Sequence, residues 1–484
     1  MLSRRKLLAS VSAATVVGFS VDARAWVGGK KKKSGCSQLP PLDGTLVTDP
    51  ATLAEYAVDA GNMVHLSPVA VLNPGSVNDI EKMICFCRTH HISVAARGQG
   101  HTTFGQSMTD GGLVIDMGGL AAVHSISEQG ADVGAGIKWT ALTTEALNFG
   151  LTPQVLTGYI DLSVGGTLSV GGISSTNGHG AQVDHVQALQ IVSGDGKTRW
   201  CSDKKHRHLF EAALAGLGQY GIITRAIIDL VPAPQMARVY LIDHSTSAGF
   251  FADLQILLDR GELDDVYNFG FPDGQGGWVY QLTATKFYDP AAPPDDAHLL
   301  RDLSVSALDV PSQDMPYLHY VLRVNVAIDF FRGLGLWDGV QHPWFDMFLP
   351  DWSVQPFVES VMSTLTPEDV GPTGFLLLFP QKVSALSRPN LRLPKGKEWV
   401  FLFDVLTAAP TPGVDPAYEA HMLARNRTWF EQARALGGTR YPIGSLEFSK
   451  LDWILHYFER WPLLKHMKKK YDPAGILTPG PGIF

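Results

Sequence analysis

The spacing of apolar residues changes along the chain. Between residues 64 and 230, short apolar runs such as "VAVLN" and "ISVAAR" are separated by glycine-rich turns, and few segments have the 3.6-residue period of an amphipathic helix. "SVNDIEKMICFCRTHH" is one such helix, with Ser76 as its expected N-cap. Its apolar face comprises Ile80, Met83, Ile84 and Cys87. The pattern predicts an α+β fold rather than a regular doubly wound sheet.

The composition changes after "VPAPQ", at residues 231–235, and stays different to about residue 438. Phenylalanine, tryptophan and tyrosine become more frequent there. Helical patterns occur in "FFADLQILLDRGEL" and "DPAYEAHMLARNRTWFEQARALGG", and strand patterns in "GGWVYQLTATKFYD", "TGFLLLFPQ" and "EWVFLFDVL". An aromatic-rich domain suits a lid over a flat or apolar substrate, although aromatic stripes also occur in an ordinary core.

The length of the chain, 484 residues, exceeds what one hydrophobic core supports, because single cores stop growing at roughly 250–300 residues. Two domains are therefore expected. The sequence divides into a targeting segment (1–25), a leader (26–60), a first domain (61–235), a second domain (236–440) and a C-terminal segment (441–484).

The N-terminus has the three parts of a cleavable signal. "SRRKLLAS" carries paired Arg4 and Arg5, an apolar run follows to Phe19, and an A-x-A site ends at Ala25. The paired arginines after a serine resemble a bacterial twin-arginine signal, which predicts export to the periplasm or beyond. The alternatives are an ordinary secretory signal and a membrane anchor. The rest of the chain has no run of 18 apolar residues, the length of a membrane span.

Charge and cysteine content narrow the function classes. The formal net charge of -8 argues against a nucleic-acid partner, because phosphate binding requires a basic surface. The four cysteines have no pattern of spacing, and Cys85 and Cys87 point in different directions on one helix. Together with Cys36 and Cys201 they are expected to be buried thiols rather than a disulfide framework or a metal site.

Three glycine-rich stretches are candidates for ligand binding. The first, "VAARGQGHTTFGQSM", is not the dinucleotide fingerprint, because Gly105 comes too late and no helical pattern follows. The second is "GYIDLSVGGTLSVGGISSTNGHG", and the third is "LAGLGQYGIITRAIIDL". Backbone N–H groups and small hydroxyls of this kind suit a pyrophosphate. "SGDGKT" lacks the first glycine of a phosphate loop and is expected to form a hairpin turn at Asp195 and Gly196.

Taken together, these stretches resemble the FAD-linked oxidase family named for vanillyl-alcohol oxidase and p-cresol methylhydroxylase, and within it the cytokinin dehydrogenases of bacterial type. The matching motifs are "RGQGHTTFGQ", "DLSVGGTLSVGGIS", "HLFEAALAGLGQYGIITRA", "GLWDGVQHPW" and "YDPAGILTPGPGIF". The resemblance implies a two-domain fold. Its FAD-binding domain has two α/β subdomains, to which the C-terminal segment returns. Its substrate domain has an antiparallel sheet and flanking helices.

The resemblance also implies which residues bind FAD. His101 matches the histidine that anchors the flavin covalently through its 8α-methyl carbon. The residues implied as cofactor-binding are Gly98, Gln99, Gly100, His101, Thr102, Gln106, Ser163, Ser169, Ile173 and Ile223. The implied partners are a small-molecule substrate and an electron acceptor, which is oxygen, a quinone or a protein.

The chain departs from the family at two positions. Where cytokinin dehydrogenases have the aspartate that takes the substrate's amine proton, this chain has Gly158, which cannot accept a proton. The nearest acid, Asp161, points to the opposite face if the segment is a strand, so we expect it to be structural or solvent-exposed unless a turn brings it round. Near the C-terminus, Pro481 replaces a glutamine that lies close to the cofactor in many members. The catalytic base is therefore unassigned.

Three hypotheses of function follow. The first is a cytokinin-dehydrogenase-like enzyme that oxidises N6-isoprenoid amines, with hydride passing to flavin N5 and a relocated base. The second is an oxidoreductase of the same fold acting on an alcohol, a sugar or another amine, with Gly158 enlarging the pocket. The third is a flavin-binding protein without turnover, which the retained flavin loops disfavour.

Overall fold

The chain begins its first domain with a four-stranded sheet in the order β3-β4-β6-β5. The computed structural model describes residues 16–20, 25–28 and 39–484. Strands β4, β6 and β5 are parallel, and β3 joins the edge antiparallel to β4. Their bounds are β3 Thr45–Val47, β4 Ala70–Asn73, β5 Val94–Arg97 and β6 Leu113–Asp116. Strand β3 lies within residues 26–60 and pairs with β4.

Helix α3, Val77–His90, covers this sheet with the apolar face expected from the sequence. Ser76 is its N-cap residue, but its hydroxyl donates to Asp43 Oδ2 (2.7 Å) instead of capping the helix. The short helix α2, Pro50–Glu55, precedes β4. A parallel sheet needs such a cover because its strands are apolar on both faces.

A five-stranded antiparallel sheet in the order β11-β10-β12-β8-β7 forms the second half of the first domain. The hairpin expected at Asp195 and Gly196 is confirmed, since it joins β10 to β11 with Gly196 at a φ of +76°. The bounds are β7 Val123–Ser127, β8 Gly130–Gly134, β10 Val186–Val192, β11 Thr198–Ser202 and β12 Ile222–Ile228. The same part of the chain forms helices α4 Trp139–Leu147, α5 Val164–Val170 and α6 Arg207–Ala213. It also forms strands β9 Leu151–Pro153 and β13 Leu230–Pro232, which pair with each other.

The second domain is an eight-stranded antiparallel sheet in the order β17-β14-β16-β15-β19-β20-β18-β21. The bounds are β14 Met236–His244, β15 Asp265–Pro272, β16 Trp278–Tyr288, β17 Ser312–Pro316, β18 Phe345–Pro350, β19 Phe375–Lys382, β20 Trp399–Leu406 and β21 Thr439–Arg440. All the helices and strands quoted above for this domain are confirmed. The two-domain α+β fold is confirmed with them.

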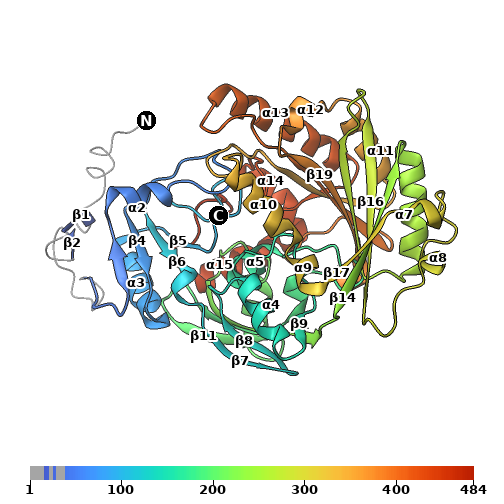
Figure 1. Cartoon of the computed structure of the whole chain (residues 1–484). Helices are drawn as coiled ribbons and strands as arrows, with labels where there is room; N and C mark the ends of the chain where they lie inside the picture. Colours follow the sequence, from blue (N-terminus) through green and yellow to red (C-terminus); the bar gives the residue numbers. More distant parts are fainter. Residues whose placement is uncertain (1–15, 21–24, 29–38) are drawn as a thin grey trace.

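Three helices cover the outer face of this sheet. Phe345, Met347 and Leu349 of β18 pack there against helices α7, α11 and α13. These helices span α7 Ser247–Arg260, α11 Val354–Met362 and α13 Pro416–Ala435. Because strand residues alternate between faces, residues 346 and 348 point the other way, toward the first domain. Figure 1 shows α7 and α11 outside the sheet at the right, with the first domain on its inner side.

The C-terminal segment packs against the first domain. Leu477 forms a parallel bridge with Val94, and the N–H of Thr478 donates to the carbonyl of Val94 (2.7 Å). The Lys468 ammonium donates to the carbonyl of Leu477 (2.9 Å) and to that of Gln219 (3.1 Å). The other helices and strands are β1 Val16–Ser20, β2 Ala25–Gly28, α8 Asp296–Leu299, α9 Tyr317–Val321, α10 Arg323–Gly333, α12 Pro367–Val370, α14 Lys450–Tyr457 and α15 Trp461–Tyr471.

The cysteines require one correction. Cys87 and Cys201 are buried free thiols, as expected, and burial raises the pKa of Cys201 to about 12. Cys85 is disulfide-bonded, which corrects the expectation of a buried thiol. The reason is the helix geometry, because α3 turns Cys87 into the core and leaves Cys85 only half-buried. Cys36 and both signal arginines lie outside the described residues. Within residues 39–484, no helix is long and apolar enough to cross a membrane.

Candidate active site

A cavity of about 660 Å³ lies between the glycine-rich segments of the first domain and the face of the eight-stranded sheet that is turned toward them. Every residue that the sequence predicted to bind the cofactor lines this one cavity: Gly98, Gln99, Gly100, His101, Thr102, Gln106, Ser163, Ser169, Ile173 and Ile223. Thr478 of the C-terminal segment lines it as well. The three glycine-rich stretches therefore converge, although Gly98 and Ile223 are 125 positions apart in the sequence.

The loop after β5 approaches α5 closely at a glycine. A Cβ atom on Gly98 would stand 1.9 Å from the hydroxyl oxygen of Ser163, the residue that precedes α5. Gly100 follows with a φ of +61°, a left-handed conformation that favours glycine. The loop is held from outside by Arg97, which donates to the carbonyl of Val58 (2.6 Å), and by Asp59, which accepts from the N–H of Gly105 (2.6 Å). Glycine is needed at residue 98 because the Ser163 side chain occupies the space that a Cβ atom would take.

The third stretch is joined to α5 by backbone hydrogen bonds. The N–H of Ala215 donates to the carbonyl of Leu168 (2.9 Å), and that of Leu217 to the carbonyl of Ser169 (2.8 Å). Ala215 and Leu217 both have a φ of +52°, so this turn is strained for residues with side chains. Strain of this kind is commonly kept where backbone must face a ligand.

His101 lines the cavity and contacts two aromatic rings. Its ring lies 4.9 Å from that of Tyr159 and 5.4 Å, nearly edge-on, from that of Trp344. Burial, with smaller contributions from His342 and Arg332, lowers the pKa of His101 to about 3. The imidazole is therefore neutral at physiological pH. A neutral imidazole has a lone pair available for bond formation.

The sheet face opposite the glycine loops is mostly apolar. Its aromatic and aliphatic lining side chains are Tyr267, Phe269, Phe271, Phe375, Leu377, Phe379, Leu402 and Leu406, and Gln281 lines it as well. The Arg323 guanidinium, at the start of α10, lies between the rings of Tyr320 (3.9 Å) and Tyr267 (4.8 Å) and also borders the cavity. Such a surface fits a flat, largely apolar substrate.

Two acids on this face were missed by the sequence analysis. Asp346 of β18 and Asp404 of β20 both line the cavity, and each is only 4% exposed. The signal was present in the sequence, because each aspartate interrupts an otherwise apolar strand, "FDMFLP" and "WVFLFDVL". That the two face one another across the sheet depends on a strand register which the sequence does not reveal.

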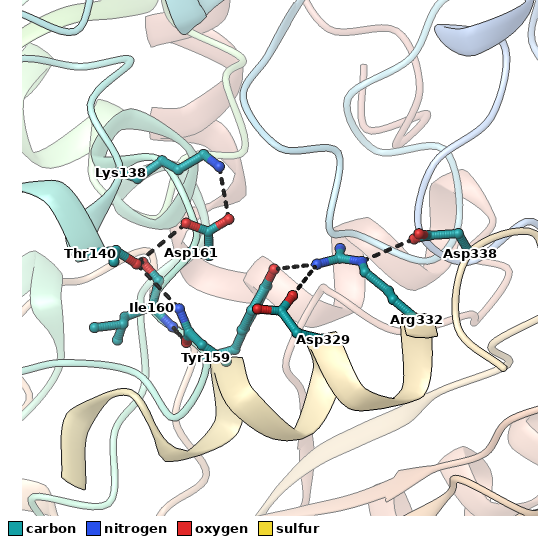
Figure 2. Close-up of polar contacts among 9 residues, drawn as sticks. Lys138, Thr140, Tyr159, Ile160, Asp161, Asp329, Arg332 and Asp338 are labelled. Carbon is teal, nitrogen blue, oxygen red and sulfur yellow. Dashed lines mark hydrogen bonds and ion pairs between the residues drawn. The ribbon is translucent and has the colours of Figure 1, made fainter. Parts of the chain in front are cut away.

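Asp161 is a structural acid, as expected. Its carboxylate forms an ion pair with Lys138 (2.7 Å) and accepts from the Thr140 hydroxyl (3.3 Å), as Figure 2 shows. It does not belong to the cavity lining, whereas Gly158 and Tyr159 just before it do. The Tyr159 hydroxyl turns instead toward Arg332 of α10 (3.4 Å), which also contacts Asp338 (Figure 2).

We expect Asp161→Asn to leave the chemistry unchanged. The pair that it breaks is partly exposed, at 31% for Asp161 and 41% for Lys138, and such pairs contribute about 0–1 kcal/mol to stability. Chemical denaturation should therefore show a small loss in the free energy of unfolding. Turnover measured on the same preparation should match that of the wild-type chain. A large loss of turnover would contradict the assignment of Asp161 as structural.

The residues present fit a flavin dinucleotide. The lining joins glycine backbone, small hydroxyls and aliphatic residues on one side to aromatic residues on the other, as a ligand with a pyrophosphate and a flat ring system requires. The Ser107 hydroxyl is buried at this cavity without a hydrogen-bond partner among the described residues. An orphaned donor of this kind is expected where a polar ligand binds.

Comparisons with known proteins agree with this geometry. A family model described as an FAD binding domain matches residues 68–202, and one described as "Cytokinin dehydrogenase 1, FAD and cytokinin binding" matches residues 264–484. An uncharacterized oxidoreductase, ORF5 in the fasciation locus of Rhodococcoides fascians, is 33% identical over 91% of this chain and 99% of its own length. Cytokinin dehydrogenase 1 of Arabidopsis thaliana is 32% identical, over 88% of this chain and 80% of that protein. This chain belongs to the cytokinin dehydrogenase family.

Membership in the cytokinin dehydrogenase family makes the chain an FAD-dependent oxidoreductase. Cytokinin dehydrogenase 4 of Oryza sativa subsp. japonica is similar over a comparable length, with 33% identity over 92% of this chain and 90% of that protein. The matches span both domains, so the resemblance covers the glycine loops and the aromatic sheet face alike.

The two departures from the family have structural outcomes. A Cβ atom on Gly158 would meet only Val324, at 3.7 Å, so the missing side chain leaves open space in the cavity. Pro481 lies outside the cavity lining, and its carbonyl accepts from the indole N–H of Trp453 (2.9 Å). The interaction of Pro481 is thus made by its main chain, which a change of side chain leaves intact.

Proposed function

We propose that this member of the cytokinin dehydrogenase family oxidises the secondary amine of N6-isoprenoid adenines and thereby releases the side chain. The observation that carries the proposal is the cavity itself, in which flavin-type glycine loops face an aromatic sheet with a few buried polar groups. An adenine with an isoprenoid substituent is flat and apolar, and it carries the C–H bond next to nitrogen that the chemistry needs. The names of the relatives support the same substrate class.

The chain's residues have distinct tasks in this reaction. Bound FAD would accept the hydride from the substrate carbon next to the nitrogen. Gly98 to Thr102, Gln106, Ser163, Ser169, Ile173 and Ile223 would hold the cofactor. The aromatic residues of β15 and β19 would hold the adenine ring and exclude water, which strengthens every polar interaction in the site. Residues 61–235 with 441–484 would form the FAD domain, and residues 236–440 the substrate domain.

We further propose that His101 attaches the flavin covalently and that the protein is exported by the twin-arginine route. A neutral imidazole beside Tyr159 and Trp344 supports the attachment. A covalent tether would prevent an exported enzyme from losing FAD where none can be resupplied. The arginine pair of "SRRKLLAS" supports the route, because that route carries folded proteins.

Anaerobic mixing with N6-isopentenyladenine tests the proposed substrate. We expect the flavin absorbance to bleach within one turnover and to return when oxygen or a quinone is added. An alcohol, a sugar and an unrelated amine serve as comparison donors, since the space beside Gly158 would also admit them. Bleaching by one of these but not by any N6-alkyladenine would contradict the proposal. Bleaching by none of the donors would favour a flavin-binding protein without turnover.

A further inference from the structure

The buried acids Asp346 and Asp404 form a pair on the cavity side of the eight-stranded sheet. They stand directly opposite each other in the register of β18 and β20. Side chains opposite each other in an antiparallel pair have Cβ atoms about 4.5–5.5 Å apart, which places the two carboxyl groups in contact. Both line the cavity, so a ligand there meets the pair and not a closed core.

The pair is poorly supplied with hydrogen-bond donors. Among the described residues, no N–H or O–H group donates to either carboxyl oxygen of Asp346, or to Oδ1 of Asp404. Two carboxylates cannot bond to one another, but a single proton shared between them supplies a donor. The space behind Asp346 is filled by backbone, because a Cβ atom on Gly444 would lie 2.2 Å from its Oδ2. The open direction is toward the cavity.

The charged and titratable neighbours of the pair are few. Arg440 of β21 acts on Asp346 through its positive charge, and Tyr441 lies near both acids. On the other side of β20, the residue opposite Asp404 is Leu377. Burial raises the pKa of both acids. At Asp346, the hydrogen bond to Asp404 and the positive charge of Arg440 partly offset this rise in pKa. At Asp404, the charge of Asp346 raises the pKa further. Of the two carboxyl groups, Asp404 therefore holds its proton more strongly and Asp346 ionises first.

Asp346 is close in the chain to a residue that contacts His101. It follows Trp344 by two residues, and side chains on the same side of an extended segment repeat about every 7 Å. The Trp344 ring in turn lies 5.4 Å from that of His101, the proposed flavin anchor. Asp161, the only acid near Gly158 in sequence, is turned away and paired with Lys138.

We propose that the Asp346–Asp404 pair is the proton acceptor of the oxidation, with Asp346 receiving the substrate's N–H proton. This inference rests on the proposed function for the identity of the substrate. In the step, the C–H bond breaks and its electron pair leaves with the hydrogen to the flavin, while the N–H bond breaks and its proton passes to Asp346. The amine becomes an imine, oxidised by two electrons, and the flavin gains those two electrons. Water then hydrolyses the imine, and the proton leaves Asp346 for solvent.

The first test is flavin reduction by N6-isopentenyladenine in Asp346→Asn. Asparagine keeps the shape and can hydrogen-bond to Asp404, but it accepts no proton. We expect the rate constant to fall about 10²- to 10⁴-fold, the usual contribution of a positioned general base. The wild-type rate should fall as pH drops through the raised pKa of the pair, and it should slow in D₂O. The variant should lose both dependences. Asp161→Asn, the same substitution outside the cavity, is the matched control and should behave as wild type.

The second test does not depend on turnover. A carboxyl whose pKa is raised on folding favours the folded state while protonated, and that contribution is lost as pH rises through the folded-state pKa. We therefore expect the melting temperature of holoenzyme Asp404→Asn to exceed that of wild type at pH 8, with the difference disappearing toward pH 4. Equal pH profiles of stability for the two proteins would mean that the pair does not share a proton and would overturn the inference.

The outcomes separate this inference from the proposed function. If N6-isopentenyladenine reduces wild type, Asp346→Asn and Asp404→Asn at the same rate, the substrate stands and the pair is not the acceptor. If it reduces none of them but another donor reduces wild type, the proposed substrate is wrong. The pH and D₂O dependences measured with that donor then decide the role of the pair.

Discussion

His101→Ala should lose all covalently held flavin. In the wild-type chain we expect acid precipitation to leave a yellow pellet, because the flavin is bonded to the imidazole. The variant should give a colourless pellet and a yellow supernatant. The structure supports this expectation because the ring of His101 faces the cavity and burial keeps its pKa near 3, which leaves the imidazole neutral. The measurement is the ratio of flavin to protein absorbance in the redissolved pellet.

Two controls make this result interpretable. Tyr159→Phe keeps an aromatic ring beside His101 and should retain the yellow pellet. Before acid treatment, the folded His101→Ala variant should still bind added FAD reversibly, because the glycine loops remain. A yellow pellet from His101→Ala would show that another residue carries the flavin. A colourless pellet from wild type would show that the family's tether is absent from this chain.

Gly98→Ala should weaken FAD binding about 10- to 100-fold. The added methyl would stand 1.9 Å from the Ser163 hydroxyl oxygen and 3.0 Å from its Cβ atom, so the loop after β5 and the start of α5 must move apart. Overpacking of this kind costs about 1–3 kcal/mol, and 1.4 kcal/mol is tenfold in a dissociation constant. The effect is best measured as the Kd of FAD in the His101→Ala background, where binding is reversible.

A second substitution, at Ser163, should reduce the loss of FAD affinity that Gly98→Ala causes. Ser163 supplies both atoms that the new methyl would meet, and its side chain makes no capping bond to α5. Ser163→Gly therefore removes the clash at small cost to the helix. Because Ser163 also lines the cofactor site, the reference is Ser163→Gly alone. We expect Gly98→Ala to weaken FAD binding less in the Ser163→Gly background than in the chain that keeps Ser163. An equal loss in both backgrounds would show that the two loops are not coupled through this contact.

The convergence of three glycine-rich stretches was predictable from the residues. Each combines glycine with small polar residues at the end of an apolar run, and such backbone has few uses other than close approach. The structure places all ten predicted residues around one cavity. Strands such as "EWVFLFDVL" were predictable as well, because their apolar runs have strand length and end at turn residues.

The pairing of Asp346 with Asp404 was not predictable, since 58 residues separate them and only the sheet register brings them opposite each other. The disulfide of Cys85 was not predictable either, because the spacing of the four cysteines in the sequence indicates no pairing. The role of Asp161 was predictable only in part. Its offset from Gly158 predicted that it turns away if the segment is a strand, but residues 158–161 form no strand. The ion pair with Lys138, which holds Asp161 outside the cavity lining, appears only in the folded chain.

The sequence by itself determined the fold class, the family and the cofactor loops of this protein, because these depend on local periodicity and on motifs of neighbouring residues. Only the tertiary structure decided which acids face the substrate cavity. That choice depends on strand register and on the packing of one domain against the other, which are set by contacts between residues far apart in the chain.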